Sequence, residues 1–140
     1  MAEFNPTTEQ KCSTLLGNVM ETIDALNELV NSDRFRFAAG TKHQAQAEMR
    51  HAMARISKYG YQSCDDATRD LIRQGSDIIQ RFQAVFAGTE NDPQMISTLF
   101  RDAADFTRTT AGKAERDEDV IDWMNEHQWD SAYTAGNSAV

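Results

Sequence analysis

Several residue types are scarce in this chain of 140 residues, and their scarcity limits what it can be. Only two prolines and seven glycines are present, which leaves room for long helices. No apolar run approaches the roughly 20 residues needed to cross a membrane. The first residues lack a basic region followed by an apolar stretch, so we expect a cytoplasmic protein that is not exported.

Cysteine is equally scarce, with one residue at Cys12 and one at Cys64. Two cysteines make neither a disulfide framework nor a four-ligand zinc site. Cys64 at the start of a helix would gain thiolate character from the helix dipole, but Asp65 and Asp66 beside it oppose that effect. We therefore interpret both cysteines as structural residues.

Positive charge is in deficit, because the net charge is −8, and this argues against indiscriminate binding of nucleic acid. The deficit is not uniform along the chain. Residues 1–33 carry a net −5, residues 34–82 a net +4 and residues 83–140 a net −7. A basic middle between acidic ends can be complementary within one fold or between copies of it.

Hydrophobic residues at helical spacing are abundant, most clearly between Ser63 and Gly88. Ser63 is a suitable N-cap and Gly88 a C-terminal stop. The apolar face of this stretch predicts a helix that the rest of the fold covers. Its members are Ala67, Leu71, Gly75, Ile78, Phe82, Val85 and Phe86.

The same periodicity predicts four further helices. Thr7 with Gln10 and Thr41 with Gln44 match capping boxes, and Pro93 fits the first position of a helix. The expected ranges are about 7–30, 41–59, 93–110 and 113–128. We therefore predict an all-α protein, an antiparallel four-helix bundle with an additional C-terminal helix. One domain would span residues 1–130, with a short flexible polar tail at 131–140.

Enzymatic motifs are absent from the sequence. It has no nucleophile–base spacing and no glycine-rich phosphate loop. Glu48 and His51 form a Glu-x-x-His pair, which is half of a di-iron signature without its second copy. We therefore expect no enzyme activity, no cofactor and no metal.

An exposed histidine on a bundle helix leaves a histidine phosphotransfer domain as one alternative. That family follows its histidine with Lys-Gly at the third and fourth positions, where this chain has Ala54 and Arg55 after His51. Arg55 and Lys58 could neutralise a phosphate, but the pattern departs from the family.

Nucleic-acid binding is a second alternative, because the basic middle also contains aromatic residues. Three arginines there have acids three or four residues before them, as in Asp65–Arg69, Asp70–Arg73 and Asp77–Arg81, and are expected to form intrahelical pairs. A helical, viral coat-like subunit would use the remaining bases. They are Arg34, Arg36, Lys42, Arg50, Arg55 and Lys58.

The preferred interpretation is a protein–protein interaction or self-assembly protein with no chemistry of its own. Opposite charge blocks favour head-to-tail contacts, so the expected partner is a second copy. Aromatic and methionine side chains would supply the apolar anchors. They are Phe35, Phe37, Trp123, Met124 and Trp129. Two alternatives remain open: a monomer whose acidic ends fold onto its basic middle, and an acidic inhibitor that mimics nucleic acid.

Overall fold

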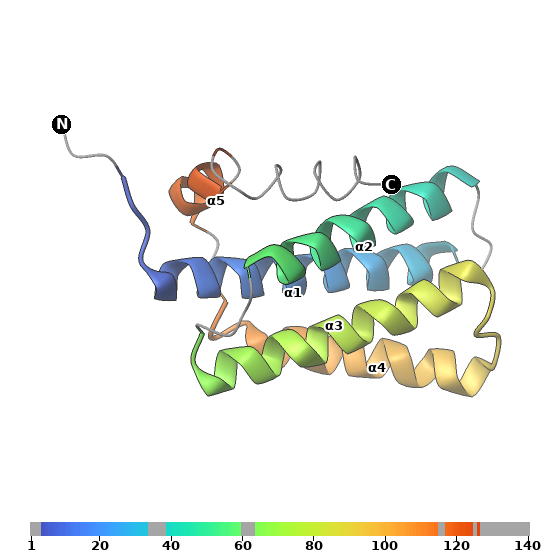
Figure 1. Cartoon of the computed structure of the whole chain (residues 1–140). Coiled ribbons are helices and arrows are strands. Elements are labelled where there is room, and N and C mark those ends of the chain that lie inside the picture. Colours follow the sequence, from blue (N-terminus) through green and yellow to red (C-terminus); the bar gives the residue numbers. More distant parts are fainter. Residues whose placement is uncertain (1–3, 34–38, 60–63, 115–116, 125, 127–140) are drawn as a thin grey trace.

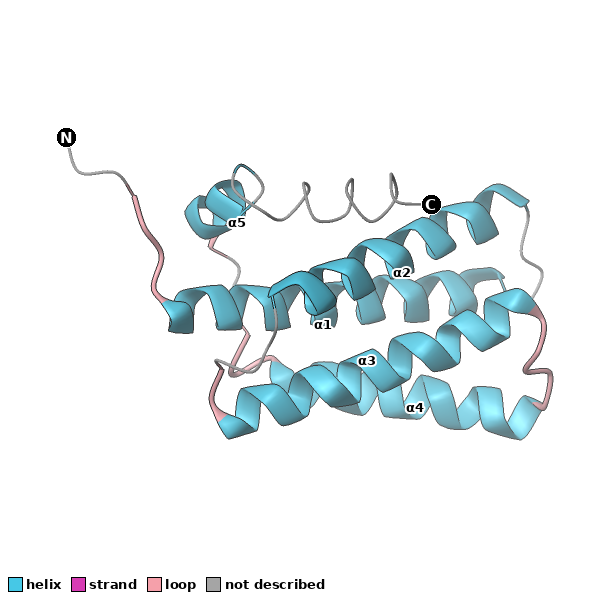
Figure 2. Cartoon of the chain, viewed as in Figure 1, coloured by secondary structure: helices cyan, strands magenta, loops and turns pink. Residues whose placement is uncertain are grey.

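The computed structural model describes residues 4–33, 39–59, 64–114, 117–124 and 126. All regular structure in these residues is helical (Figure 2). The helices are α1 (Thr8–Asp33), α2 (Ala39–Tyr59), α3 (Asp66–Ala87), α4 (Pro93–Thr110) and α5 (Glu118–Met124). The tail predicted at 131–140 lies outside the described residues.

The first four helices run up and down in turn, and α5 lies at one end of the bundle (Figure 1). This confirms the predicted all-α bundle. However, α1 rather than α3 is the element that the others cover, because α1 packs against each of the other four helices. Its face of Leu15, Leu16, Val19, Ile23 and Leu26 is at most 2% exposed.

Helix ends follow the capping chemistry that the sequence predicts at several positions. The Thr7 amide donates to Gln10 Oε1 at 2.7 Å, and the Gln10 amide donates to Thr7 Oγ1 at 3.1 Å, so the first capping box is formed. Gly88 ends α3 with a φ of 82°, a left-handed conformation that favours glycine. Asp92 caps α4 by accepting from the Gln94 amide at 3.0 Å, directly before Pro93.

The start of α3 differs from the prediction, since its cap is Asp65. The Asp65 carboxylate accepts from the Thr68 amide at 2.7 Å. This hydrogen bond to the charged form is the main reason that the pKa of Asp65 lies below its ordinary value of 3.8. Ser63, the predicted cap, lies outside the described residues.

The predicted last helix is too long at its N-terminal end. The chain after α4 makes a turn, in which the amides of Lys113 and Ala114 donate to the Thr110 carbonyl at 2.9 and 2.8 Å. The helix α5 starts only at Glu118, because the Asp117 carboxylate accepts from the amide of Asp119 at 3.0 Å. Acidic residues do occupy its first turn, as the helix dipole favours.

Gly75 lies in the core where α1, α3 and α4 meet. A Cβ atom at this position would lie 2.4 Å from Val19 Cγ1 and 2.9 Å from Phe106 Cζ. The sequence placed Gly75 on the core side, and the structure shows that side chains from α1 and α4 occupy the space that its missing Cβ leaves. The close packing of these three helices therefore depends on a residue without a side chain.

The two cysteines are joined. Cys12 in α1 and Cys64, just before α3, form a disulfide across 52 residues of sequence. The interpretation of both as structural residues agrees with this bond, but the sequence did not reveal the pairing.

Candidate interaction surface

The end of the bundle that carries α5 is built on the N-terminal turns of α1. The α5 side chains of Val120 and Met124 are 0% exposed and belong to the same hydrophobic core as α1. Met124, predicted as a partner anchor, is therefore buried within its own chain and offers no surface to a partner. The structure thus places α5 on α1 of the same molecule.

Trp123, the second predicted anchor in α5, is only partly buried against the core. The Nζ atom of Lys11 in α1 lies 4.7 Å from the centroid of its ring. A cation over an indole ring contributes about 0.5–1 kcal/mol at such a site. This contact helps to hold α5 on α1 while part of the ring stays accessible to solvent.

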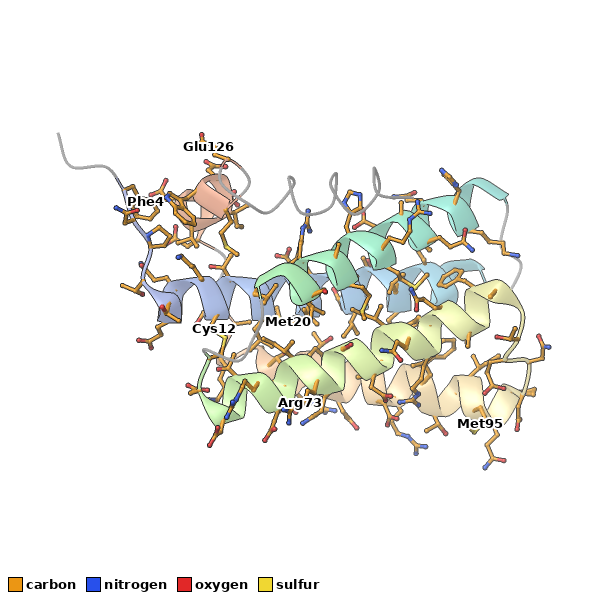
Figure 3. All side chains as sticks on the ribbon, viewed as in Figure 1. Phe4, Cys12, Met20, Arg73, Met95 and Glu126 are labelled. Atoms are coloured by element: carbon orange, nitrogen blue, oxygen red, sulfur yellow. A yellow bond between two sulfur atoms is a disulfide. The ribbon has the colours of Figure 1, made fainter. Side chains whose placement is uncertain are left out.

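Phe4 lies on the arm before α1, at the same end of the molecule (Figure 3). It is 45% exposed, and with Met95 at 49% it is one of two large hydrophobic side chains exposed in the part of the chain that the structure describes. Figure 3 shows Phe4 and Met95 at opposite ends of the bundle. Sequence reasoning missed Phe4, because an isolated aromatic residue in a short arm has no periodicity that predicts its exposure.

We define the α5 end as Phe4, Lys11, Trp123 and the carboxylates of α5. Its charge is strongly negative, since Glu118, Asp119 and Asp122 fall in a helix of seven residues. Of the five helices, α2 alone carries a net positive charge, with four bases and one acid in its sequence. The acidic and basic blocks of the sequence therefore fall largely on different helices of the bundle.

Three of the six bases predicted to contact nucleic acid have described side chains. Arg50 is exposed, whereas Lys42 and Arg55 are half-buried. Arg50 and Arg55 are five residues apart on α2, which separates them by about 140° around the helix. Arg34, Arg36 and the side chain of Lys58 lie outside the described part of the chain, as do the predicted anchors Phe35, Phe37 and Trp129.

Intrahelical pairing was predicted for three arginines of α3, and the structure confirms one pair. Arg73 pairs with Asp70 at 3.7 Å between Nη1 and Oδ1. Arg69 pairs with Asp66 and not with the predicted Asp65, which is engaged as the helix cap. The prediction that Arg81 pairs with Asp77 is wrong as well.

Arg81 reaches across to α4 instead. Its Nη1 atom lies 2.9 Å from Asp102 Oδ2. A further pair, Asp105 with Arg108, lies along α4. The outer surface of α3 and α4 is thus largely neutralised by its own side chains, and such exposed pairs each contribute little to stability.

The histidine expected to face water is half-buried. His51 lies on α2 three residues after Glu48, which lines a groove between α1 and α2. No group of three or more His, Cys, Asp or Glu side chains that could hold a metal ion occurs among the described residues. A half-buried imidazole is still partly exposed, so the phosphotransfer alternative stays a prediction.

Hollows indent the described surface, and two of them lie beside α1. The groove between α1 and α2 measures about 540 Å³ and is lined by Glu21, Glu28 and Glu48 together with neutral polar and apolar residues, among them Asn18, Thr22, Leu26 and Leu29. A depression of about 590 Å³ lies at the disulfide, lined by Thr8, Glu9, Cys12, Ser13, Cys64, Asp65, Thr68, Gly112 and Lys113. The second hollow lies on the α1 turns that carry α5.

Comparison with known proteins does not assign a function to this chain. No protein-family model matches it, and neither does any curated protein or solved structure. None of the helices in the described residues is both long and apolar enough to cross a membrane. The functional argument therefore depends on the chain's own surface.

Proposed function

We propose that this chain is a non-enzymatic protein–protein interaction protein that assembles with copies of itself through the α5 end. The observation that carries the proposal is the pair of aromatic side chains, Phe4 and Trp123, that remain accessible at this end. Aromatic residues with a polar rim are the typical anchors of protein interfaces. The proposal retains Trp123 from the sequence prediction, adds Phe4 and omits Met124.

Charge supports a second copy as the partner. The α5 end is acidic, and α2 of the same molecule carries a net positive charge with Arg50 exposed. Two different surfaces that meet give a head-to-tail contact, which forms rings or filaments. Charge complementarity sets the orientation and raises the association rate, while the aromatic side chains provide the affinity.

The cytoplasmic location expected from the sequence is part of this proposal. Disulfides are rare in the cytosol, and those that form there usually sense redox conditions or take part in catalysis. In a cytoplasmic protein we therefore expect the Cys12–Cys64 bond to form and to be reduced as conditions change.

The test is the mass of Phe4→Ala and Trp123→Ala variants, measured by sedimentation at equal concentration with the wild-type chain. We expect both variants to retain the helical circular dichroism signal and to dissociate to the 15.7 kDa monomer. Met95→Ala is the matched control, because it removes an equally exposed hydrophobic side chain at the other end. If Met95→Ala dissociates the assembly and the other two do not, the surface is wrong.

A further inference from the structure

The disulfide holds the segment of α1 to which α5 is attached. Cys12 is the first buried residue of α1, since Thr8 and Glu9 before it are exposed and Gln10 and Lys11 are half-buried. Figure 1 shows the first turn of α1 extending past the ends of α3 and α4. Helix ends of this kind open locally at low cost unless a contact restrains them.

Lys11, adjacent to Cys12 in sequence, is the residue whose ammonium group lies over Trp123. The bond to Cys64 therefore fixes the backbone one residue from this contact. When the bond is present, Lys11 is held in place for Trp123 by a covalent link to the start of α3. Without the bond, only the non-covalent contacts of the first turns restrain Lys11.

The presence or absence of the Cys12–Cys64 bond can affect α5 because this helix is short. Helices below about 12–15 residues are marginal in water, so a seven-residue helix depends on its contacts with the bundle. Those contacts are Val120 and Met124 in the core and Trp123 beneath Lys11. Loss of docking is therefore expected to melt α5 and to uncover the apolar surface of α1 beneath it.

We propose that the Cys12–Cys64 disulfide is a redox switch that controls the docking of α5 on α1. The proposal concerns contacts within one chain and stands whether or not the chain assembles. Cys12 and Cys64 line the 590 Å³ depression and are 9% and 8% exposed. A small dithiol or a thioredoxin-like protein dithiol would reach the bond through this depression. In the exchange, the dithiol gives two electrons and two protons and becomes a disulfide, while the S–S bond breaks to leave Cys12 and Cys64 as thiols.

Hydrogen exchange of the full chain, with and without dithiothreitol, tests this switch. We expect reduction to remove most of the exchange protection of the α5 amides, while the amides of the buried part of α4 stay protected. A Trp129→Phe variant leaves Trp123 as the single tryptophan, since the chain has two. Reduction should make its fluorescence more easily quenched by acrylamide.

A Cys12→Ser/Cys64→Ser variant should behave as the reduced chain in either buffer and should not respond to dithiothreitol. Lys11→Met should speed exchange in α5 even when the disulfide is intact. Unchanged exchange in α5 and unchanged quenching of Trp123 after reduction would overturn the proposal. Amides of α5 that stay as protected as those of α4 after reduction would also overturn it, because the bond would then stabilise the whole bundle without controlling α5.

Discussion

Replacing Gly75 by alanine tests the packing of the bundle at its tightest point. The new Cβ atom would lie 2.4 Å from Val19 Cγ1 and 2.9 Å from Phe106 Cζ, so both side chains must move. Neither moves easily, because Val19 is 0% and Phe106 4% exposed, and valine is stiff about χ1. Overpacking of this kind costs about 1–3 kcal/mol, and two close contacts place Gly75→Ala in the upper part of that range.

Alanine also gains about 1 kcal/mol over glycine inside a helix. The two effects leave a net destabilisation of about 1–2 kcal/mol. For a chain of 140 residues this lowers Tm by about 3–8 °C. Urea unfolding followed by circular dichroism gives the free energy of unfolding directly.

Two further variants complete the test of Gly75. Gly112→Ala is the control, because nothing lies within 4 Å of a Cβ atom at that position and the expected change is close to zero. Val19→Ala removes the closest contact, so the double variant should lose less stability than the sum of the single variants, by at least about 0.5 kcal/mol. A Gly75→Ala chain as stable as the wild type would refute the packing argument.

Three other predictions concern local features. Reduction of the Cys12–Cys64 bond, which closes a loop of 52 residues, should lower the free energy of unfolding by up to about 4 kcal/mol; identical thermal melts with and without reductant would contradict this. Because the pKa of Asp65 is lowered, the stability that its charge provides is present above pH 3.8 and is lost as the pH falls through the lowered value. The Tm difference between wild type and Asp65→Ala should therefore shrink in acid. A difference that grows in acid would be inconsistent with the cap. Asp102→Ala should lower the free energy of unfolding by less than about 1 kcal/mol, and by less still in 1 M salt. A loss above about 2 kcal/mol would show that the pair with Arg81 is not a simple surface ion pair.

The features that could be predicted from the sequence are those set by neighbours within one helix turn. The Thr7–Gln10 box, the left-handed Gly88 and the Asp92–Pro93 start all depend on residues at most four apart. Helical periodicity likewise identified most of the buried α1 and α3 faces, but it missed Ile72 and Ile79 of α3, which are 0% exposed. In α3 only Ala67, which is exposed, was wrongly placed on the buried face.

The features that were missed depend on which elements meet in space. The spacing of Asp77 and Arg81 indicated an intrahelical pair, but packing brings Asp102 of α4 to Arg81. The disulfide joins cysteines 52 residues apart, a distance over which the sequence contains no geometric information. The burial of Met124 depends in the same way on where α5 docks, because the pattern shows an apolar side but not what covers it.

The central claim, self-assembly through the α5 end, is tested most directly by light scattering on a sizing column at low and high salt. Absorbance at 260 and 280 nm should be read on the same peak. We predict a mass that is a multiple of 15.7 kDa at low salt, falls at high salt and has the absorbance ratio of protein alone. A monomer at every salt and protein concentration would contradict the claim, and a large species rich in 260 nm absorbance would indicate a nucleic-acid partner instead.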